Sequence, residues 1–240
     1  SADQRRRADG FCCGWLCATD AAVTPDAAAW TAILLSLRVA VVATVCSLPI
    51  AVWVAWFLAR RKFPGHGLLN LLVHLPLVLP PVVTGYLLLV VFGRHGALGG
   101  WLYDTLGITL AFRWTGAALA AAIMAFPLTV RAIRLGFEAV DTGLEDAAAT
   151  LGASRLRIFA TITLPLIGPA LLAGAVLGFA KALGEFGATI TFVAAIPGQT
   201  QTIPSAIYAL LQVPGQEGAV VSLVVVSIVQ AMSTLAMAEW

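Results

Sequence analysis

Charged residues are scarce in this sequence. Asp, Glu, Lys and Arg make up 11% of the 240 residues, whereas hydrophobic residues make up 60%. An ordinary soluble domain has about 25% charged residues, so this composition excludes the soluble globular class and indicates a protein of the lipid bilayer. The net charge of +2 is small, and no block of basic residues lies beside aromatic ones. We therefore expect no nucleic-acid partner.

The motifs of common catalytic sites are also missing. The sequence contains no Gly-x-x-x-x-Gly-Lys-Ser/Thr phosphate loop, so we expect the chain itself neither to bind nor to hydrolyse ATP. His66, His74 and His95 have no metal-ligand spacing between them. Three of the four cysteines crowd between Cys12 and Cys17, a pattern that favours neither a disulfide framework nor a metal site. The prediction is a non-enzyme with no catalytic residue, cofactor or metal of its own.

Long apolar runs are abundant instead. A membrane-spanning helix needs about 20 predominantly apolar residues. Five runs reach or approach that length: Ala32 to Ala59, Leu68 to Phe92, Gly116 to Val130, Leu164 to Leu183 and Gly218 to Ala238. The predicted fold is therefore an all-α integral membrane protein with five transmembrane helices. The stretch from Phe186 to Leu211 is moderately apolar but broken by Pro197 and Pro204, which predicts a re-entrant or gate-forming segment.

The N-terminus leaves a sixth span open. Basic residues from Arg5 to Arg7 precede an apolar patch from Phe11 to Ala22, which is the pattern of a signal remnant or an extra helix. The patch is short and is interrupted by Gly14. We expect residues 1–23 to be an irregular extension outside the core, and residues 24–240 to form the transmembrane domain.

Basic residues in the loops predict the orientation. Lys and Arg are enriched in cytoplasmic loops. Here they follow the first span, as Arg60, Arg61 and Lys62, and they recur in the long loop after the third span. The loop after the second span holds two basic residues, Arg94 and Arg113, and the loop after the fourth span holds none. We expect the long loop, residues 136–163, to be cytoplasmic, with the N-terminus outside and the C-terminus inside.

This long loop has the pattern of two short helices joined by a turn. Thr142 is a candidate helix cap, and Glu145 three residues later completes a capping box. Gly152 permits a chain reversal, and Ser154 is placed to cap a second helix that enters the membrane at Pro165. The alanines between them give a flat face that a groove on another protein accepts closely.

Seven positions of this loop form a distinctive pattern: Asp146, Ala147, Ala148, Gly152, Ile162, Leu164 and Pro165. In these positions the loop resembles the EAA loop of the binding-protein-dependent ABC importer permeases, which have the MetI-like fold. The resemblance implies that the loop docks into a cleft of a separate ATP-hydrolysing subunit. Either Glu145 or Asp146 then makes the acidic contact; register favours Asp146 and leaves Glu145 as the cap. The predicted ATPase-coupling residues are Glu145, Asp146, Ala147, Ala148, Gly152, Arg155, Leu164 and Pro165.

The resemblance extends over about residues 24–240. Segments similar to molybdate permeases are Leu75 to Leu89, Phe126 to Arg134, Leu183 to Phe192 and Ile196 to Tyr208. It implies a molybdate permease subunit of the bacterial inner membrane, with sulfate, thiosulfate or tungstate as alternative substrates. The implied partners are a second permease copy, a cytoplasmic ATPase dimer that binds ATP and Mg, and a periplasmic molybdate-binding protein.

Polar residues near the end of the fourth span are candidates for the transport pathway. Lys181 and Glu185 are four apart, a spacing that predicts an ion pair on one helical face. We interpret the pair as structural, with a direct role in anion passage as the alternative. A stripe of Ala170, Gly174 and Gly178 predicts a helix-packing seam. The candidate pathway or gate residues are Thr84, Glu185, Thr189, Thr191, Thr200, Thr202 and Ser205.

A self-contained secondary anion transporter is the rival from another class. It needs an intramembrane ion-coupling site and usually an internal repeat, and the sequence shows neither. Moving a dianion inward against an inside-negative potential costs roughly 4.6 kcal/mol per 100 mV. We therefore expect this chain to depend on an external source of energy.

Overall fold

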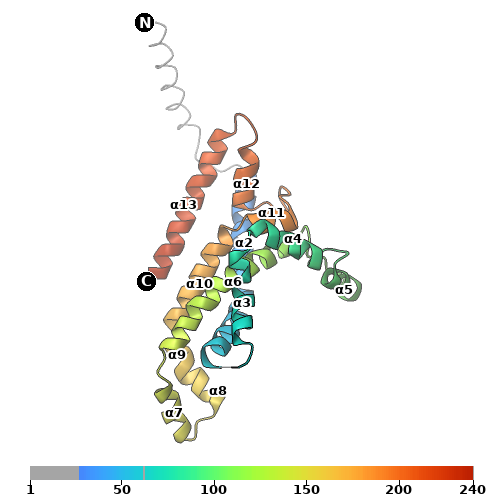
Figure 1. The fold of residues 1–240 in the computed structure, drawn as a ribbon. Coiled ribbons are helices and arrows are strands. Elements are labelled where there is room, and N and C mark those ends of the chain that lie inside the picture. Colours follow the sequence, from blue (N-terminus) through green and yellow to red (C-terminus); the bar gives the residue numbers. More distant parts are fainter. Residues whose placement is uncertain (1–26, 62, 240) are drawn as a thin grey trace.

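The computed structural model describes residues 27–61 and 63–239, and the regular structure in these residues is helical (Figure 1). The prediction about residues 1–23 lies outside this range. The elements are α2 (Ala27–Arg60), α3 (His66–Val78), α4 (Pro81–Phe92), α5 (Ala97–Leu106), α6 (Trp114–Ala139), α7 (Thr142–Thr150), α8 (Arg155–Ile158), the π-helix η1 (Phe159–Thr163), α9 (Leu164–Leu166), α10 (Gly168–Leu183), α11 (Gly187–Val193), α12 (Ile203–Leu210) and α13 (Glu217–Glu239).

Three single helices among the described residues are long and apolar enough to cross a membrane: α2, α6 and α13. Two further pairs meet the same test only as bent units, namely α3 with α4, and the helical stretch from Arg155 to Leu166 with α10. Counted as one span each, the pairs bring the described spans to five, in agreement with the predicted all-α membrane fold.

The second predicted span, Leu68 to Phe92, is not one helix. Its two parts meet at an angle of 112°. The backbone is extended at Leu79 and Pro80, and Pro81 starts α4. A residue that precedes proline is pushed out of the helical region, whereas proline itself suits the first turn of a new helix. The two consecutive prolines therefore end one helix and begin another.

The fourth predicted span is bent as well. The stretch from Arg155 to Leu166 and α10 meet at 67°, with Ile167 between them. Pro169 has no N–H, so it cannot continue the hydrogen-bond ladder from the preceding turn. The predicted span from Leu164 to Leu183 thus begins in the last turn of the first limb and continues in the second.

The core forms where α6 packs against α2 and α10. Small residues allow the close approach: a Cβ on Gly136 of α6 would overlap the Cβ of Ala170, and one on Gly178 would overlap the Thr129 hydroxyl. A Cβ on Gly174 would lie 2.8 Å from Cγ1 of Ile133. The predicted small-residue stripe is therefore a packing seam, as small residues are in many membrane helix pairs.

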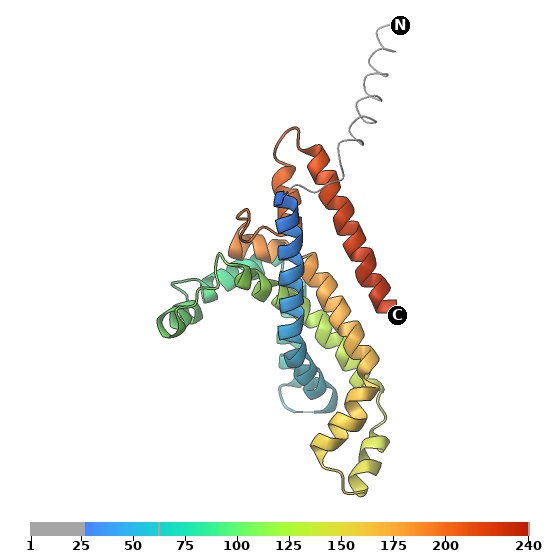
Figure 2. The same cartoon turned by 180° about the vertical axis from the view of Figure 1, so that it is seen from behind.

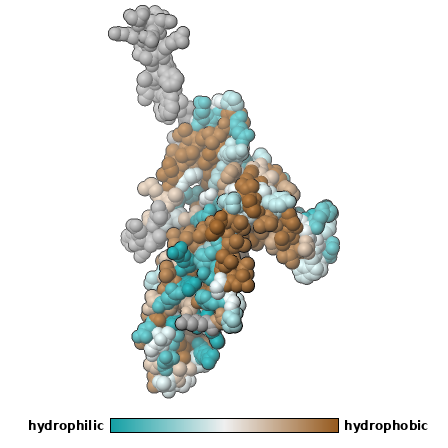
Figure 3. Space-filling model, in the orientation of Figure 1, coloured by the Kyte–Doolittle hydropathy of each residue, from teal (hydrophilic) through white to brown (hydrophobic). Residues whose placement is uncertain are grey.

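The helices place α7 and α8 at one end of the molecule, which we call the α7 end, and α12 with the start of α13 at the other (Figures 1 and 2). Helix α5 projects sideways beyond α4. Figure 3 shows hydrophobic surface over α4 and along α13, where Val221, Ile228 and Val229 are exposed. The surface near the α7 end is a mixture of hydrophilic, pale and hydrophobic residues, and Leu151 and Leu156 are exposed there.

Candidate functional site

The α7 end is built by two capped helices and a tight turn. Asp141, not Thr142, caps α7: its Oδ1 accepts a hydrogen bond from the Gly143 N–H at 2.8 Å, and Thr142 is the first helical residue. The predicted cap at Thr142 was therefore wrong by one residue. The chain reverses at Gly152, whose φ is 84°, a conformation that glycine adopts without steric cost. The predicted Ser154 cap is confirmed, since its hydroxyl accepts from the Arg157 N–H at 3.4 Å.

Glu145 does not complete a capping box. Its Oε1 accepts hydrogen bonds from Nη2 of Arg60 at 3.1 Å and from Oγ1 of Thr163 at 2.7 Å. Arg60 also donates to the carbonyl oxygen of Val140 at 3.4 Å. The Arg60 and Glu145 side chains are 17% and 25% exposed, so the ion pair is partly shielded from water. We call Arg60, Glu145 and Thr163 the Glu145 cluster; it joins α7 to the end of α2 and to η1.

The remaining predicted coupling residues lie on the outer surface of the same end. Asp146 and Ala147 are exposed, Ala148 is half-buried, and no residue of α7 is buried. Leu151 beside the turn is 88% exposed, which is unusual for a large apolar side chain without a partner. Gly152 and Arg155 are exposed in the turn and in α8, while Leu164 and Pro165 lie farther along, in α9.

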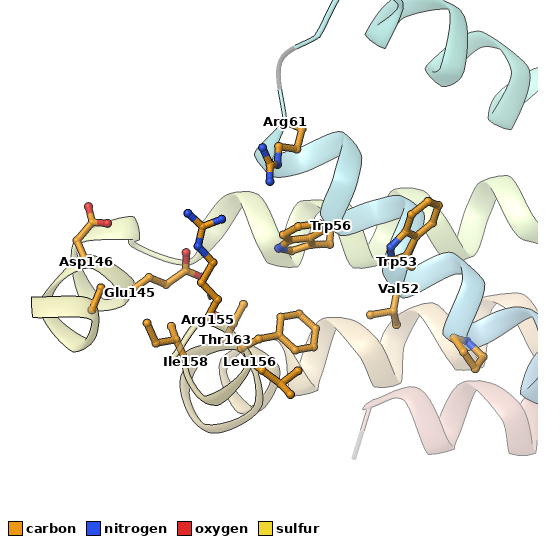
Figure 4. Close-up of a pocket in the computed structure, with 13 residues that line it drawn as sticks. Val52, Trp53, Trp56, Arg61, Glu145, Asp146, Arg155, Leu156, Ile158 and Thr163 are labelled. Carbon is orange, nitrogen blue, oxygen red and sulfur yellow. Dashed lines mark hydrogen bonds between the residues drawn. The ribbon is translucent and has the colours of Figure 1, made fainter. Parts of the chain in front are cut away.

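A cavity of about 850 Å³ lies between α2 and the α7 end (Figure 4). Its apolar wall comes from α2, α8 and η1, and its charged residues come from α7, α8 and Arg61, which directly follows α2. The lining residues are Pro49, Val52, Trp53, Trp56, Arg61, Glu145, Asp146, Ala149, Arg155, Leu156, Ile158, Phe159 and Thr163.

The Lys181–Glu185 ion pair is confirmed, with Nζ and Oε2 3.1 Å apart. Its geometry differs from the prediction, because α10 ends at Leu183 and Glu185 follows that end. Oε1 of Glu185 accepts a hydrogen bond from the Ala188 N–H at 3.0 Å, in the first turn of α11. The side chain of Glu185 is 2% exposed. The pair therefore connects the end of α10 to the start of α11 and does not lie along one helix.

The candidate pathway hydroxyls fall into two places. Thr84 lies on α4, which packs against α11, the helix that carries Thr189 and Thr191. Thr200, Thr202 and Ser205 lie at the start of α12. All except Thr191 are buried.

Most of these hydroxyls bond within their own segment. Thr191 donates to the carbonyl of Gly187 at 2.9 Å, Thr200 to that of Ala194 at 3.0 Å, and Ser205 to that of Thr202 at 2.9 Å. The buried Thr84 hydroxyl has no hydrogen-bond partner among the described residues. Within residues 27–61 and 63–239, no group of three or more His, Cys, Asp or Glu side chains is placed to hold a metal ion.

Sequence reasoning missed three residues that organise these places. Arg60 was used only as evidence of orientation, and Thr163 was read as part of a helix; both bind Glu145. Ser36 of α2 accepts a hydrogen bond from the Ile203 N–H at 2.7 Å and so fixes the start of α12. Each contact joins residues far apart in the chain, so no local pattern indicates it.

Comparison with known proteins gives the family. Residues 47–240 match the family described as "Binding-protein-dependent transport system inner membrane component". The chain belongs to this family. It is 59% identical over 211 residues to the molybdenum transport system permease protein ModB of Escherichia coli (strain K12), covering 88% of this chain and 92% of that protein. ModB of Haemophilus influenzae is 56% identical over 210 residues.

More distant members of the family and solved structures agree with this fold. The sulfate transport system permease protein CysT of Escherichia coli is 39% identical over 158 residues, which is 66% of this chain and 57% of that protein. A bacterial ABC transporter that imports alginate matches with a TM-score of 0.69 at 18% identity, over 89% of this chain and 77% of that one. The MetNI methionine ABC transporter matches with a TM-score of 0.64 at 14% identity, over 88% and 91%. The fold is that of an ABC importer permease.

The Glu145 cluster generates a stability prediction. We expect Arg60→Ala and Glu145→Ala each to destabilise the purified chain, because each leaves a partly buried charge without its partner. The double variant should lose less free energy of unfolding than the two single variants together, with a coupling free energy of about 0.5–3 kcal/mol in a double-mutant cycle of unfolding.

Arg134 and Glu138 form a matched control on α6, with Nε and Oε1 2.7 Å apart and side chains 26% and 43% exposed. Their coupling should be about 0.3–0.5 kcal/mol. Equal coupling in both pairs would contradict a special role for the cluster.

Proposed function

We propose that this chain is the permease subunit of an ABC importer that carries molybdate across the bacterial inner membrane. The observation that carries the proposal is the 59% identity to ModB of Escherichia coli across 92% of that protein. The similarity to the sulfate permease CysT is weaker and covers 57% of its length. Molybdate is therefore the favoured substrate, with tungstate, sulfate and thiosulfate as alternatives.

The α7 end is the proposed docking surface for a separate cytoplasmic ATPase. It presents exposed Asp146, Ala147 and Leu151 in an arrangement that a groove on another protein can accept. Asp146 is the proposed acidic contact, because Glu145 is already occupied by Arg60 and Thr163. The sequence lacks a phosphate loop, so ATP and Mg are assigned to the partner ATPase and no enzyme activity to this chain.

This arrangement provides contacts through which a movement of the ATPase can be passed to the membrane helices. A displacement of α7 is passed by the Glu145 cluster to the end of α2 and to η1, which leads through α9 to α10. The end of α10 is in turn connected to α11 by Glu185. The proposed gate residues at the α4–α11 contact and at the start of α12 would then move with these helices. Coupled movement of packed elements is the usual basis of such switching.

The proposed assembly contains two copies of the permease, two ATPases and a periplasmic molybdate-binding protein. The enrichment of Lys and Arg in the loops supports a cytoplasmic position for the α7 end and for the C-terminus in this proposal. We assign substrate specificity mainly to the binding protein. The alternative of a secondary transporter is disfavoured by the membership of the family.

The acidic contact can be tested by charge reversal. We expect Asp146→Arg to reduce ATPase co-purification and molybdate uptake at least about tenfold, since losing one side of a buried charged contact costs roughly 2–5 kcal/mol. Asp104→Arg is the matched control, an exposed acidic residue on α5 far from the α7 end, and it should retain uptake. Uptake by Asp146→Arg equal to that of the Asp104 control would contradict the proposed contact.

The substrate can be tested by competition in the assembled importer. Uptake of radiolabelled molybdate should be inhibited by excess unlabelled molybdate and tungstate and should persist in excess sulfate. Uptake should also cease when the ATPase carries a substitution in its phosphate loop. Full inhibition by sulfate would overturn the choice of molybdate, and uptake that survives loss of ATP hydrolysis would favour the secondary transporter.

A further inference from the structure

The cavity between α2 and the α7 end has a shape that the coupling function does not explain. It follows α2 from Pro49 to Arg61, a rise of roughly 18 Å at about 1.5 Å per residue. One leaflet of the hydrocarbon core is about 15 Å thick, half of the total of about 30 Å. The cavity thus extends over about one leaflet, from the end of a membrane span toward its middle.

The cavity is apolar along its length and cationic at one end. Val52, Trp53 and Trp56 of α2 and Phe159 of η1 form the apolar wall, and Trp53 is 63% exposed. Figure 4 shows the indole rings of Trp53 and Trp56 along α2. Tryptophan is enriched where a span meets the membrane surface, and these two residues lie within two turns of the end of α2.

Two arginines at the charged end have no acidic partner among the described residues. Arg61 and Arg155 both line the cavity, and neither forms an ion pair there. Their guanidinium groups extend toward the open space on the side of Trp56 that faces α7 (Figure 4). The two acidic residues of the lining form no ion pair with them: Glu145 is paired with Arg60, and Asp146 forms no ion pair with Arg61 or Arg155.

We propose that this cavity binds one anionic phospholipid of the cytoplasmic leaflet. The phosphate group lies between Arg61 and Arg155, and an acyl chain lies against Trp53, Val52 and Pro49. Anionic lipid matches both halves of the site, because cationic residues near the membrane surface attract it and the wall is apolar over the depth of a leaflet. The acyl chain of a zwitterionic lipid also fits the apolar wall, but such a lipid has no net negative charge to balance Arg61 and Arg155.

The position of the site gives the lipid a consequence for coupling. Arg61 follows α2 and Arg155 starts α8, so one phosphate group bridges the two sides of the cavity that the Glu145 cluster also joins. A bound anionic lipid should therefore support the attachment of the α7 end to the membrane helices. The inference rests on the proposed cytoplasmic placement of the α7 end and not on the choice of molybdate.

Tryptophan quenching in the assembled transporter tests the site. Permease and ATPase are reconstituted in nanodiscs of phosphatidylcholine with a minor fraction of phosphatidylglycerol, and either lipid carries brominated acyl chains. The signal of the cavity is the quenching that is lost in the Trp53→Phe/Trp56→Phe variant. We expect phosphatidylglycerol to be preferred about tenfold over phosphatidylcholine, and Arg61→Gln or Arg155→Gln to reduce this preference about fivefold.

Arg157→Gln is the matched control, because Arg157 is exposed on the same short helix as Arg155 and does not line the cavity. It should keep the preference. ATPase co-purification, measured on the same samples, reports the coupling function separately. Equal quenching by the two lipids, or an equal effect of Arg155→Gln and Arg157→Gln, would overturn the inference. So would the absence of any cavity signal, the result expected if a second permease copy or the ATPase covers Trp53 and Trp56.

Discussion

Oε1 of Glu145 accepts hydrogen bonds from Arg60 and Thr163, which lie 85 and 18 positions away in the chain. This oxygen joins the exposed α7 to the end of the first described span and to the helical stretch that leads into α10. No residue of α7 is buried, so the helix has little apolar packing of its own. Its attachment depends largely on this charged contact, and the proposed transfer of movement from an ATPase depends on that attachment.

Much of the fold could be predicted because lipid imposes simple rules. A span needs about 20 apolar residues, and the five apolar runs correspond to the three long helices and the two bent helix pairs in the described residues. The stripe of Ala170, Gly174 and Gly178 predicted a packing seam on the fourth span, and the structure shows that its partner is α6. The predicted second span is broken at Pro80 and Pro81, which end α3 and begin α4, and the angle of 112° between the two helices is contained in no local pattern.

The functional details were less predictable because they depend on partners distant in sequence or on helix ends. Thr142 and Glu145 have the spacing of a capping box, yet Asp141 caps the helix and Arg60 attracts Glu145. Lys181 and Glu185 have the spacing of an intrahelical pair, yet the helix ends before Glu185. Hydroxyl residues such as Thr191 were predicted to line the transport pathway from the composition of their segments alone. Composition does not reveal that their hydroxyls bond to their own backbone.

If the Glu145 cluster attaches α7 firmly, α7 moves as one body with the membrane helices of its own chain. Spin labels at exposed Leu151 and Leu135, the latter on α6, would report their separation by pulsed electron paramagnetic resonance. The measurement uses assembled transporters with one labelled permease, in the nucleotide-free and ATP-bound states. We expect one narrow distance distribution that is the same in both states. The contrary result is a shift or broadening of the distance distribution on ATP binding that also appears in Glu145→Ala without nucleotide. It would show that α7 detaches from the bundle and does not move with the membrane helices.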